Sequence, residues 1–438
     1  MEEKKRGYLQ SFRQTPDAKH IDVLDGIRVL IILIVGWFHI WQQSWYSPSF
    51  TVPIFNEYIS LDFLLRTGYM WVDAMLLLSG FLLYLPYTQA RSELPKTLPF
   101  YKRRLIRILP SYLLAVAFFF ALSCLENKYG NLSNALKDLG AHLTFTHTFF
   151  YFSYLGSPIN GVLWTLAVEM QFYLLFPLLA RCFHKKPVLT YLGMAAIAFG
   201  YRYYVGATKP DTSMWFNQLP AFLDVYASGF VAASAFAALR KALGEKADGK
   251  VKLFFTAMIV VCACLLMQMA RAQAGSPSYE TIRQGQMDRR FPFTATLACL
   301  MVCAAFSCSG VRFLLGNRVM RFLSAISFQF YMYHQFIAVK LRELKLIPSA
   351  SETPWSAPDL HWQVSFTLIC FALAIILSTL ITYLFEKPIA RILRRKMDKK
   401  CRSFSWKGQG NAVYILPAVQ REQRKRAVHR RGRYQNPH

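Results

Sequence analysis

The stretch LDGIRVLIILIVGWFHIWQQSW, residues 24–45, decides the fold because it is apolar enough and long enough to cross a membrane. A hydrocarbon core of roughly 30 Å needs about 20 mostly apolar residues in a helix. Similar runs recur along most of the 438-residue chain, of which 54% is hydrophobic and 16% aromatic. The sequence therefore predicts an all-α, polytopic transmembrane helical bundle rather than a soluble or disordered protein.

The apolar runs predict about ten transmembrane helices, with both termini on the cytoplasmic side. The expected spans are 24–45, 68–88, 105–125, 163–183, 188–205, 219–239, 253–271, 293–309, 322–340 and 363–385. A polar stretch precedes the first span, and no small-residue cleavage site follows it. We therefore expect the first helix to stay as an anchor rather than to be removed as a signal peptide.

The net charge of +27 is distributed as in a membrane protein. Lysine and arginine gather at alternate inter-helix segments, namely before residue 20, at 102–107, 181–186, 240–252 and 312–321, and from 387 onward. This positive-inside pattern places these segments in the cytoplasm and requires no nucleic-acid partner. Arg283, Arg289 and Arg290 fall on the outer side, a local violation that could indicate a miscounted helix within 253–309.

The chain divides into three parts by composition. Residues 1–23 are predicted to be a cytoplasmic segment, 24–390 the membrane domain, and 391–438 a basic, disordered cytoplasmic tail that could touch anionic lipid. The longest outer segment, 126–162, is apolar enough to lie in the interface or to form a re-entrant element. The nine cysteines show neither disulfide nor metal-site spacing, and no metal is predicted.

Two ionisable residues interrupt the opening stretch. Arg28 and His39 are eleven residues apart, which is three helical turns, so they share one face about 16 Å apart along the axis. Arg28 would lie at the cytoplasmic edge and His39 near the bilayer midplane. At that depth an ionisable group costs several kcal/mol unless it faces protein or water, which favours a functional site. A snorkelling arginine and a hydrogen-bonded core histidine are the structural alternatives.

Other spans supply ionisable companions at similar depth. Asp73 lies in the outer third of the second span, and Glu169 lies in the outer half of the fourth with Tyr173 one turn below it. His334 lies about 18 Å from the cytoplasmic start of its span, close to the depth of His39. On the cytoplasmic side, FYKRRLIRILP at 100–110 concentrates Lys102, Arg103, Arg104 and Arg107, and FEKP adds Glu386. We therefore expect a basic inner mouth beneath a cluster of histidines and carboxylates.

These stretches together resemble a known family. The motifs are LDGIR with His39, GYMWVDAMLLLSGFLL, FYKRRLIRILPSYLL, LWTLAVEMQFYLLFPLL, LPAFLDVYASGFVAA, ISFQFYMYHQ and FEKP. In this order, across residues 20–390, they resemble the acyltransferase-3 family of membrane-bound O-acyltransferases. Val29, Thr165 and Met170 depart from the residues usual in that family, and Met170 removes a second acidic residue beside Glu169.

The resemblance implies transfer of an acyl group, usually acetyl from acetyl-coenzyme A, to a hydroxyl of a glycan, glycolipid or other envelope molecule. It also implies a bacterial plasma membrane, where the family is commonest. The phosphates of coenzyme A cannot enter hydrocarbon, so an arginine-rich cytoplasmic mouth suits this donor. Arg103, Arg104 and Arg107 are the candidates for phosphate contact, and Arg28 is expected near the pantetheine entrance.

Transfer from a thioester to an alcohol needs a base or a nucleophile that carries the acyl group. His39 is the candidate for either task, because imidazole can do both near neutral pH. Glu169 is expected to orient His39 or to share its proton. Asp73 and His334 are further candidates, and Tyr173 is a candidate hydrogen-bond donor to the acceptor or to a developing oxyanion.

Two other functional classes fit parts of the same pattern. A proton-coupled transporter or an exporter of polysaccharide or small molecules would also need midplane histidine and carboxylate groups. The sequence shows no inverted repeat and no matched interrupted helices, which argues against it. A ligand-sensing membrane protein would leave the ionisable cluster without a role. The acceptor, the acyl chain and the oligomeric state are not specified by the residues.

Overall fold

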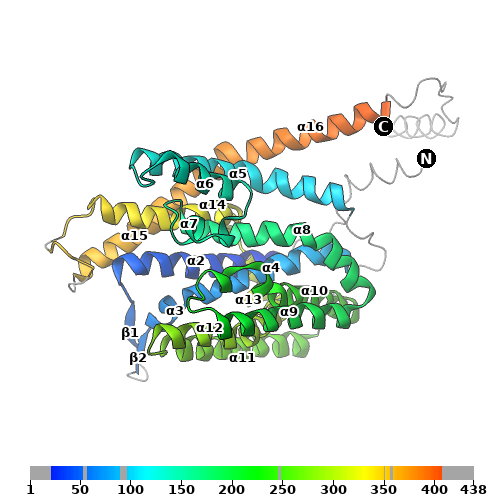
Figure 1. Ribbon diagram of the computed structural model, residues 1–438. Helices are drawn as coiled ribbons and strands as arrows, with labels where there is room; N and C mark the ends of the chain where they lie inside the picture. The colour runs from blue at the N-terminus through cyan, green and yellow to red at the C-terminus, as the bar shows by residue number, and fades with distance from the viewer. Residues whose placement is uncertain are drawn as a thin grey trace, which may run out of the picture.

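The computed structural model describes residues 21–52, 57–88, 96–244, 248–349, 351–355 and 359–406. This part of the chain is a bundle of long helices with one short hairpin (Figure 1). The hairpin pairs β1 (Ser49–Val52) with β2 (Glu57–Ser60) in antiparallel register, Ser49 opposite Ser60. The predicted all-α class is therefore confirmed.

The long helices follow the predicted spans. They are α2 (Asp22–Ser44), α4 (Trp71–Tyr84), α5 (Thr97–Leu125), α8 (Trp164–Lys185), α9 (Pro187–Thr208), α10 (Leu223–Leu243), α11 (Gly249–Ala274), α12 (Tyr279–Phe306), α14 (Arg318–Glu343) and α15 (Leu360–Leu380). Shorter helices are α3 (Asp62–Arg66), α6 (Leu132–Leu143), α7 (Tyr151–Tyr154) and α13 (Ser309–Gly316). A π-helical segment, η7 (Ile381–Glu386), joins α15 to α16 (Lys387–Trp406).

Eight helical segments of the described chain are long and apolar enough to cross a membrane. They are Asp22–Ser44, Gly68–Tyr87, Thr97–Leu125, Gly161–Lys185, Leu219–Leu243, Gly249–Ala274, Tyr279–Phe306 and Leu360–Met397. Each overlaps one of the predicted spans. The protein is therefore a multi-pass membrane protein.

The two remaining predicted spans also form helices, α9 and α14, but these are more polar. In α14 the polar side chains of Gln329 and His334 are completely buried within the protein. In α9 the buried Arg202 makes a two-pronged ion pair with Asp224 of α10, with N–O distances of 2.9 and 2.8 Å. The mean hydropathy of α9 and α14 is lower because part of each helix makes polar contacts with neighbouring helices and does not face lipid.

The region 253–309 contains two helices, α11 and α12, as predicted. However, α12 begins at Tyr279, well before the expected start at residue 293, so Arg283, Arg289 and Arg290 lie within its first turns. The apparent violation of the charge rule is therefore not a miscounted helix. Arg290 is 1% exposed and faces the protein interior, so its charge is no topology signal.

The long outer segment forms short helices rather than a further span. Helix α6 is capped at its start by the Asn131 side chain, which accepts a hydrogen bond from the backbone N–H of Asn134. A 3₁₀ turn (His147–Phe149) and α7 follow before the chain enters α8. At 12 and 4 residues, α6 and α7 are too short to cross a bilayer.

The structure changes the expectation for the C-terminal part. Residues 391–406 were expected in a disordered tail, but α16 continues from η7 to Trp406 and lies beside α5 (Figure 1). The stretch KPIARILRR has a proline in its first turn and good helix formers after it, which explains the continuation. Residues 407–438 of the predicted tail and residues 1–20 of the predicted N-terminal segment lie outside the described residues.

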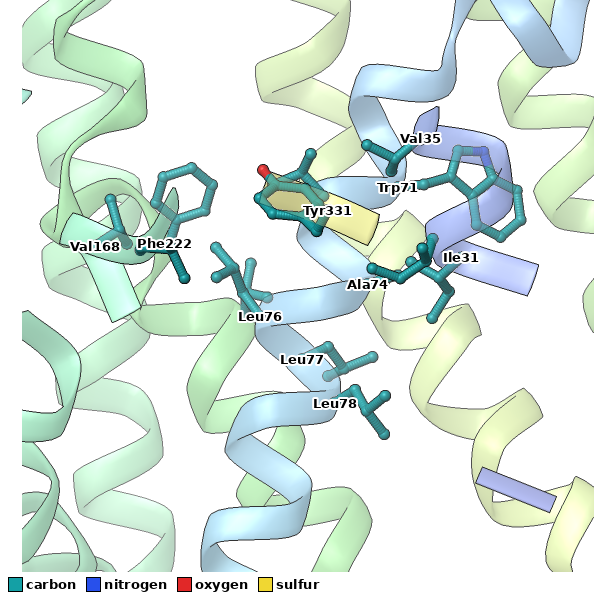
Figure 2. Close-up of a cluster of buried hydrophobic side chains, with 14 of the residues drawn as sticks. Ile31, Val35, Trp71, Ala74, Leu76, Leu77, Leu78, Val168, Phe222 and Tyr331 are labelled. Carbon is teal, nitrogen blue, oxygen red and sulfur yellow. The ribbon is translucent and has the colours of Figure 1, made fainter. Parts of the chain in front are cut away.

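Helix packing relies on close backbone approach, since lipid removes most of the hydrophobic driving force between helices. A Cβ atom added at Gly229 of α10 would lie 2.6 Å from the carbonyl oxygen of Leu77 in α4, so only glycine fits this crossing. Figure 2 shows Leu76, Leu77 and Leu78 of α4 among buried side chains of α2 and α8. Helix α4 is thus a central element around which the ionisable residues are arranged.

Candidate active site

The structure brings His39 and His334 into direct contact. Nδ1 of His39 lies 2.9 Å from Nε2 of His334, across 295 residues of sequence. The two helices can approach because a Cβ atom added at Gly36 would lie 2.6 Å from Cε1 of Phe330. The equal depths inferred from the sequence therefore correspond to a hydrogen-bonded histidine pair.

The partners of the pair assign the protons of the two neutral rings. Nδ1 of His334 lies 3.0 Å from the carbonyl oxygen of Phe330, which can only accept, so this nitrogen carries the proton. Nε2 of His334 is then the acceptor, and Nδ1 of His39 donates to it. Nε2 of His39 is left with a lone pair, which is the form that a base or a nucleophile needs.

His39 lines a cavity of about 290 Å³, which we call the outer cavity. Its other lining residues come from α4, α7, α8, α12 and α14 and from two 3₁₀ turns, Gly68–Met70 and Trp215–Asn217. They include Tyr69, Asp73, Tyr154, Trp164, Asn217, Arg283, Arg290 and Tyr331. Aromatic walls with a few polar groups are typical of sites that bind small organic ligands.

A second hollow, which we call the inner cavity, has a volume of about 470 Å³. It is lined by the first halves of α2, α5, α8 and α14, by α4, and by the end of η7. Arginines from several helices line it, together with three carboxylates: Arg28, Arg104, Arg107, Arg321, Asp25, Glu169 and Glu386. The predicted basic mouth thus exists, and its charges surround a volume large enough for part of a ligand.

Arg28 is held at the wall of the inner cavity by α14. Its Nη1 donates to Oγ of Ser324 at 3.2 Å, and that hydroxyl donates to Oδ1 of Asp25 at 2.7 Å. The guanidinium therefore stays near the cavity instead of extending to the membrane surface. This placement differs from the snorkelling alternative considered for the sequence.

Of the three arginines predicted to contact phosphate, the structure places two in the inner cavity. Arg104 and Arg107 line it, and the guanidinium of Arg104 lies 5.6 Å from the ring centre of Tyr173. Arg103 is not among its described lining residues and instead contacts Tyr87. Arg103 is offset from Arg104 by about 100° around the helix axis, and its side chain is turned toward Tyr87.

Glu169 and Tyr173 lie in the inner part of the site, not beside the histidine pair. Oε1 of Glu169 accepts hydrogen bonds from Oγ of Ser79 at 2.8 Å and from the hydroxyl of Tyr173. The expectation that Glu169 orients His39 is not met in this arrangement, because His334 fills that position. Glu169 and Tyr173 thus belong to the inner cavity.

Tyr331 separates the two cavities, since it lines both of them. Oγ1 of Thr165, which lines the inner cavity, hydrogen-bonds the Tyr331 hydroxyl at 2.9 Å. Figure 2 shows the Tyr331 ring amid the buried side chains of α2 and α4. A group passing from the inner cavity to His39 must therefore pass this tyrosine.

Asp73 has a structural partner that the sequence did not reveal. Its Oδ2 lies 3.2 Å from Nε of Arg290, and both side chains are at least 97% buried. Arg290 also donates to the carbonyl oxygen of Ala221, which Arg202 bonds as well. Asp73 is thus part of a closed network of two ion pairs. The only sequence signal for this network was the unexpected charge at 283–290.

Comparison with known proteins agrees with this geometry. A model of the acyltransferase-3 family, described as an acyltransferase domain, matches residues 21–386. The chain belongs to the acyltransferase-3 family. The match covers both cavities and ends just before α16. A comparison with solved structures gave no match.

Curated relatives of this acyltransferase-3 protein are distant. Peptidoglycan O-acetyltransferase OatA of Listeria monocytogenes is 25% identical over 222 residues, which cover 47% of this chain and 32% of that protein. O-acetyltransferase OatA of Staphylococcus aureus is 26% identical over 169 residues, 36% of this chain and 24% of that protein. An uncharacterised protein of Haemophilus influenzae is 30% identical over 124 residues, 26% of this chain and 50% of that protein. The chain spans half or less of each relative's length.

Proposed function

We propose that the protein is a membrane O-acyltransferase that moves an acetyl group from cytoplasmic acetyl-coenzyme A to a hydroxyl of an envelope glycan or glycolipid. The observation that carries this proposal is the histidine pair at the outer cavity, separated from the arginine-lined inner cavity by Tyr331. His39 presents its free lone pair at the outer cavity, and the arginine-lined inner cavity lies directly behind Tyr331. The family and the names of the two O-acetyltransferase relatives support the same chemistry.

The donor occupies the inner cavity in this proposal. Its walls carry more arginines than carboxylates, so its basic entrance attracts a polyanionic donor, whose thioester arm enters the cavity. By the positive-inside rule this end of the bundle faces the cytoplasm, where acyl-coenzyme A is made. The thioester reaches His39 by passing between Tyr331 and the side chains of α4.

The acceptor enters the outer cavity from the opposite side. The cavity offers aromatic faces, such as Trp164 and Tyr154, and hydrogen-bonding groups such as Asn217 and Arg283. A sugar ring has both an apolar face and a rim of hydroxyl groups, so it fits such a lining. In a bacterial plasma membrane, the outer cavity would face the envelope glycans.

The proton count of the reaction is the same for both roles of His39. As a base, Nε2 takes the hydroxyl proton while the oxygen attacks the thioester carbonyl. The C–S bond breaks, and the imidazolium returns the proton to the leaving thiolate. As a carrier, Nε2 itself attacks the carbonyl and His334 accepts the Nδ1 proton of the resulting acyl-imidazolium. The acceptor oxygen then takes the acyl group, Nδ1 regains its proton, and the hydroxyl proton ends on the thiol.

The test is acetyl transfer from radiolabelled acetyl-coenzyme A to extracted envelope glycans by the purified full chain. We expect His39→Ala to lower kcat about 10²–10⁴-fold, the usual loss for a missing acid–base group, while the thermal unfolding temperature stays unchanged. His361→Ala, at an exposed histidine near the start of α15, is the matched control and should keep full activity. Label found on His39 by mass spectrometry would select the carrier role.

Full transfer by His39→Ala at normal protein level would overturn the assignment of the histidine. Absence of transfer by the wild-type protein to any of several acceptor pools would instead favour the transporter alternative. In that case the histidine pair would be tested in a proton-flux measurement on reconstituted vesicles.

A further inference from the structure

A third hollow, which we call the basic groove, lies at the basic end of the bundle between α5 and the start of α16. Its volume is about 530 Å³. Five cations and one carboxylate line it, with one alanine: Arg107, Lys387, Arg391, Arg394, Arg395, Glu386 and Ala390. The basic groove thus has five cations for one carboxylate, whereas the inner cavity has four arginines for three carboxylates.

The cations of α16 are arranged on one side of the helix. Lys387, Arg391 and Arg395 follow one another at steps of four residues, and Arg394 comes three residues after Arg391, so all four lie within an arc of about 100° around the helix axis. Nζ of Lys387 lies 3.7 Å from the ring centre of Tyr383, one turn earlier. A topology signal needs only a number of positive charges near a span, whereas these charges are aligned along a hollow.

The basic groove is continuous with the inner cavity, because Arg107 and Glu386 line both. Glu386 is fixed at this junction by α14, where Nε2 of Gln329 donates to its Oε2 at 2.7 Å. The same amide nitrogen lies 2.7 Å from Oγ of Ser111 in α5. The π-helical turn η7 ends at Glu386, and such turns shift the direction of the side chains that follow.

We propose that the basic groove binds the phosphoadenosine end of the acyl-coenzyme A donor, while the pantetheine arm passes between Arg107 and Glu386 into the inner cavity. This assignment rests on the proposed function. The donor carries its 3′-phosphate and diphosphate at one end and a slender, less charged arm at the other, which matches the two connected hollows. Planar guanidinium groups bind phosphate oxygens in pairs.

The residues matched by the family model do not include the α16 part of this subsite. It ends at residue 386, whereas the α16 cations of the groove begin at Lys387. Anionic lipid headgroups share the phosphate chemistry of the donor. They would be anchored by their acyl chains in the bilayer, however, and would have no use for a passage into the inner cavity.

The test compares two donors in full-length protein reconstituted in phosphatidylcholine nanodiscs. Acetyl-coenzyme A is one donor, and S-acetyl-pantetheine, which lacks the phosphoadenosine end, is the other. We expect Arg391→Ala with Arg394→Ala to raise KM for acetyl-coenzyme A about tenfold or more, the factor for losing a charge-assisted hydrogen bond, with kcat retained. KM for S-acetyl-pantetheine should not change, and the corresponding double lysine variant should recover part of the loss.

Arg312→Ala with Arg318→Ala is the matched control, because both arginines are exposed at the same end of the bundle and line none of the three hollows. This variant should keep both KM values. Binding of radiolabelled acetyl-coenzyme A without acceptor is measured in parallel, so the result does not depend on turnover.

An equal change for both donors, or no change in KM and binding, would overturn the subsite. The lipid explanation would hold if adding phosphatidylglycerol activated the wild-type protein but not the groove variant, with donor binding unchanged. Failure of the proposed function looks different, since wild-type protein would then transfer no acetyl group from either donor.

Discussion

Two groups of buried charge lie on different sides of α4 and are built in opposite ways. In the closed ion-pair network, Asp73 faces Arg290 and Arg202 faces Asp224, and all four side chains are at least 96% buried. In the inner cavity, four arginines and three carboxylates surround an open volume of about 470 Å³. The network is neutral and its charges pair with one another, although Asp73 and Arg290 also border the outer cavity, whereas the inner cavity has an excess of positive charge.

The difference separates structural charges from charges available to a ligand. Within a membrane a buried ion must be compensated, either by a fixed partner or by something that enters. The network compensates its own charges, so its members hold α4, α9, α10 and α12 together. The inner cavity leaves part of its charge for an anionic ligand. Burial alone does not distinguish the two groups.

The first way to break the comparison is to remove one partner of the closed network. We expect Arg290→Met to lower the free energy of unfolding by about 3–5 kcal/mol, because Asp73 is left buried without its cation. Thermal unfolding in detergent, followed by size-exclusion chromatography, measures this loss. Exchanging the charges, Asp73→Arg with Arg290→Asp, should recover part of it. Wild-type stability of the single variant would show that the pair does not hold the helices.

The second prediction concerns a charge of the open group. Arg28→Met should leave stability within about 1 kcal/mol, since its hydroxyl partner Ser324 still bonds Asp25. Donor binding should weaken by about 1.5–3 kcal/mol, the range for a hydrogen bond to a charged group. The two are measured by thermal unfolding and by acetyl-coenzyme A binding. A large loss of stability with unchanged binding would move Arg28 to the structural group.

The smallest effect is expected at the neutral hydroxyl beside Glu169. Ser79→Ala removes the 2.8 Å hydrogen bond to Oε1 of Glu169, and the carboxylate keeps Tyr173 as its partner. We expect the free energy of donor binding to weaken by about 1 kcal/mol, which would be measured as a modest rise in KM for the donor. Ser234→Ala is the control, since that hydroxyl bonds only the carbonyl of Phe230 in its own helix. Equal effects of the two variants would argue against a role for the Glu169 position.

The sequence predicted the positions of the helices far better than it predicted which charged side chains pair with one another. Hydropathy placed all ten helical segments within about five residues of their ends, except for the early starts of α5 and α12 and the continuation into α16. Arg290 was read as an outer charge because its burial depends on Asp73, 217 residues away. The sequence likewise predicts a catalytic role for Asp73, since a buried carboxylate without a visible partner suggests function.

The candidate site was predictable where depth along a helix decided it. Counting residues along two spans placed His39 and His334 at one level, and the 2.9 Å contact agrees with that count. Counting did not distinguish Arg103 from Arg104, nor did it show that Glu169 belongs to the inner cavity. These outcomes depend on the rotation of each helix about its axis, which neighbouring helices set. The catalytic and binding roles of these residues stay predictions until the variants are measured.

What the sequence by itself determined was the class of the protein, the order of its helices, the basic end of the bundle and the depth of each ionisable group. These properties follow from local hydropathy, charge and helical rise, which need no knowledge of neighbours. Only the tertiary structure decided which charges are paired, where the two cavities meet at Tyr331, and that α16 adds a basic groove. Such contacts join residues hundreds of positions apart, and the rotation and close approach of packed helices select them.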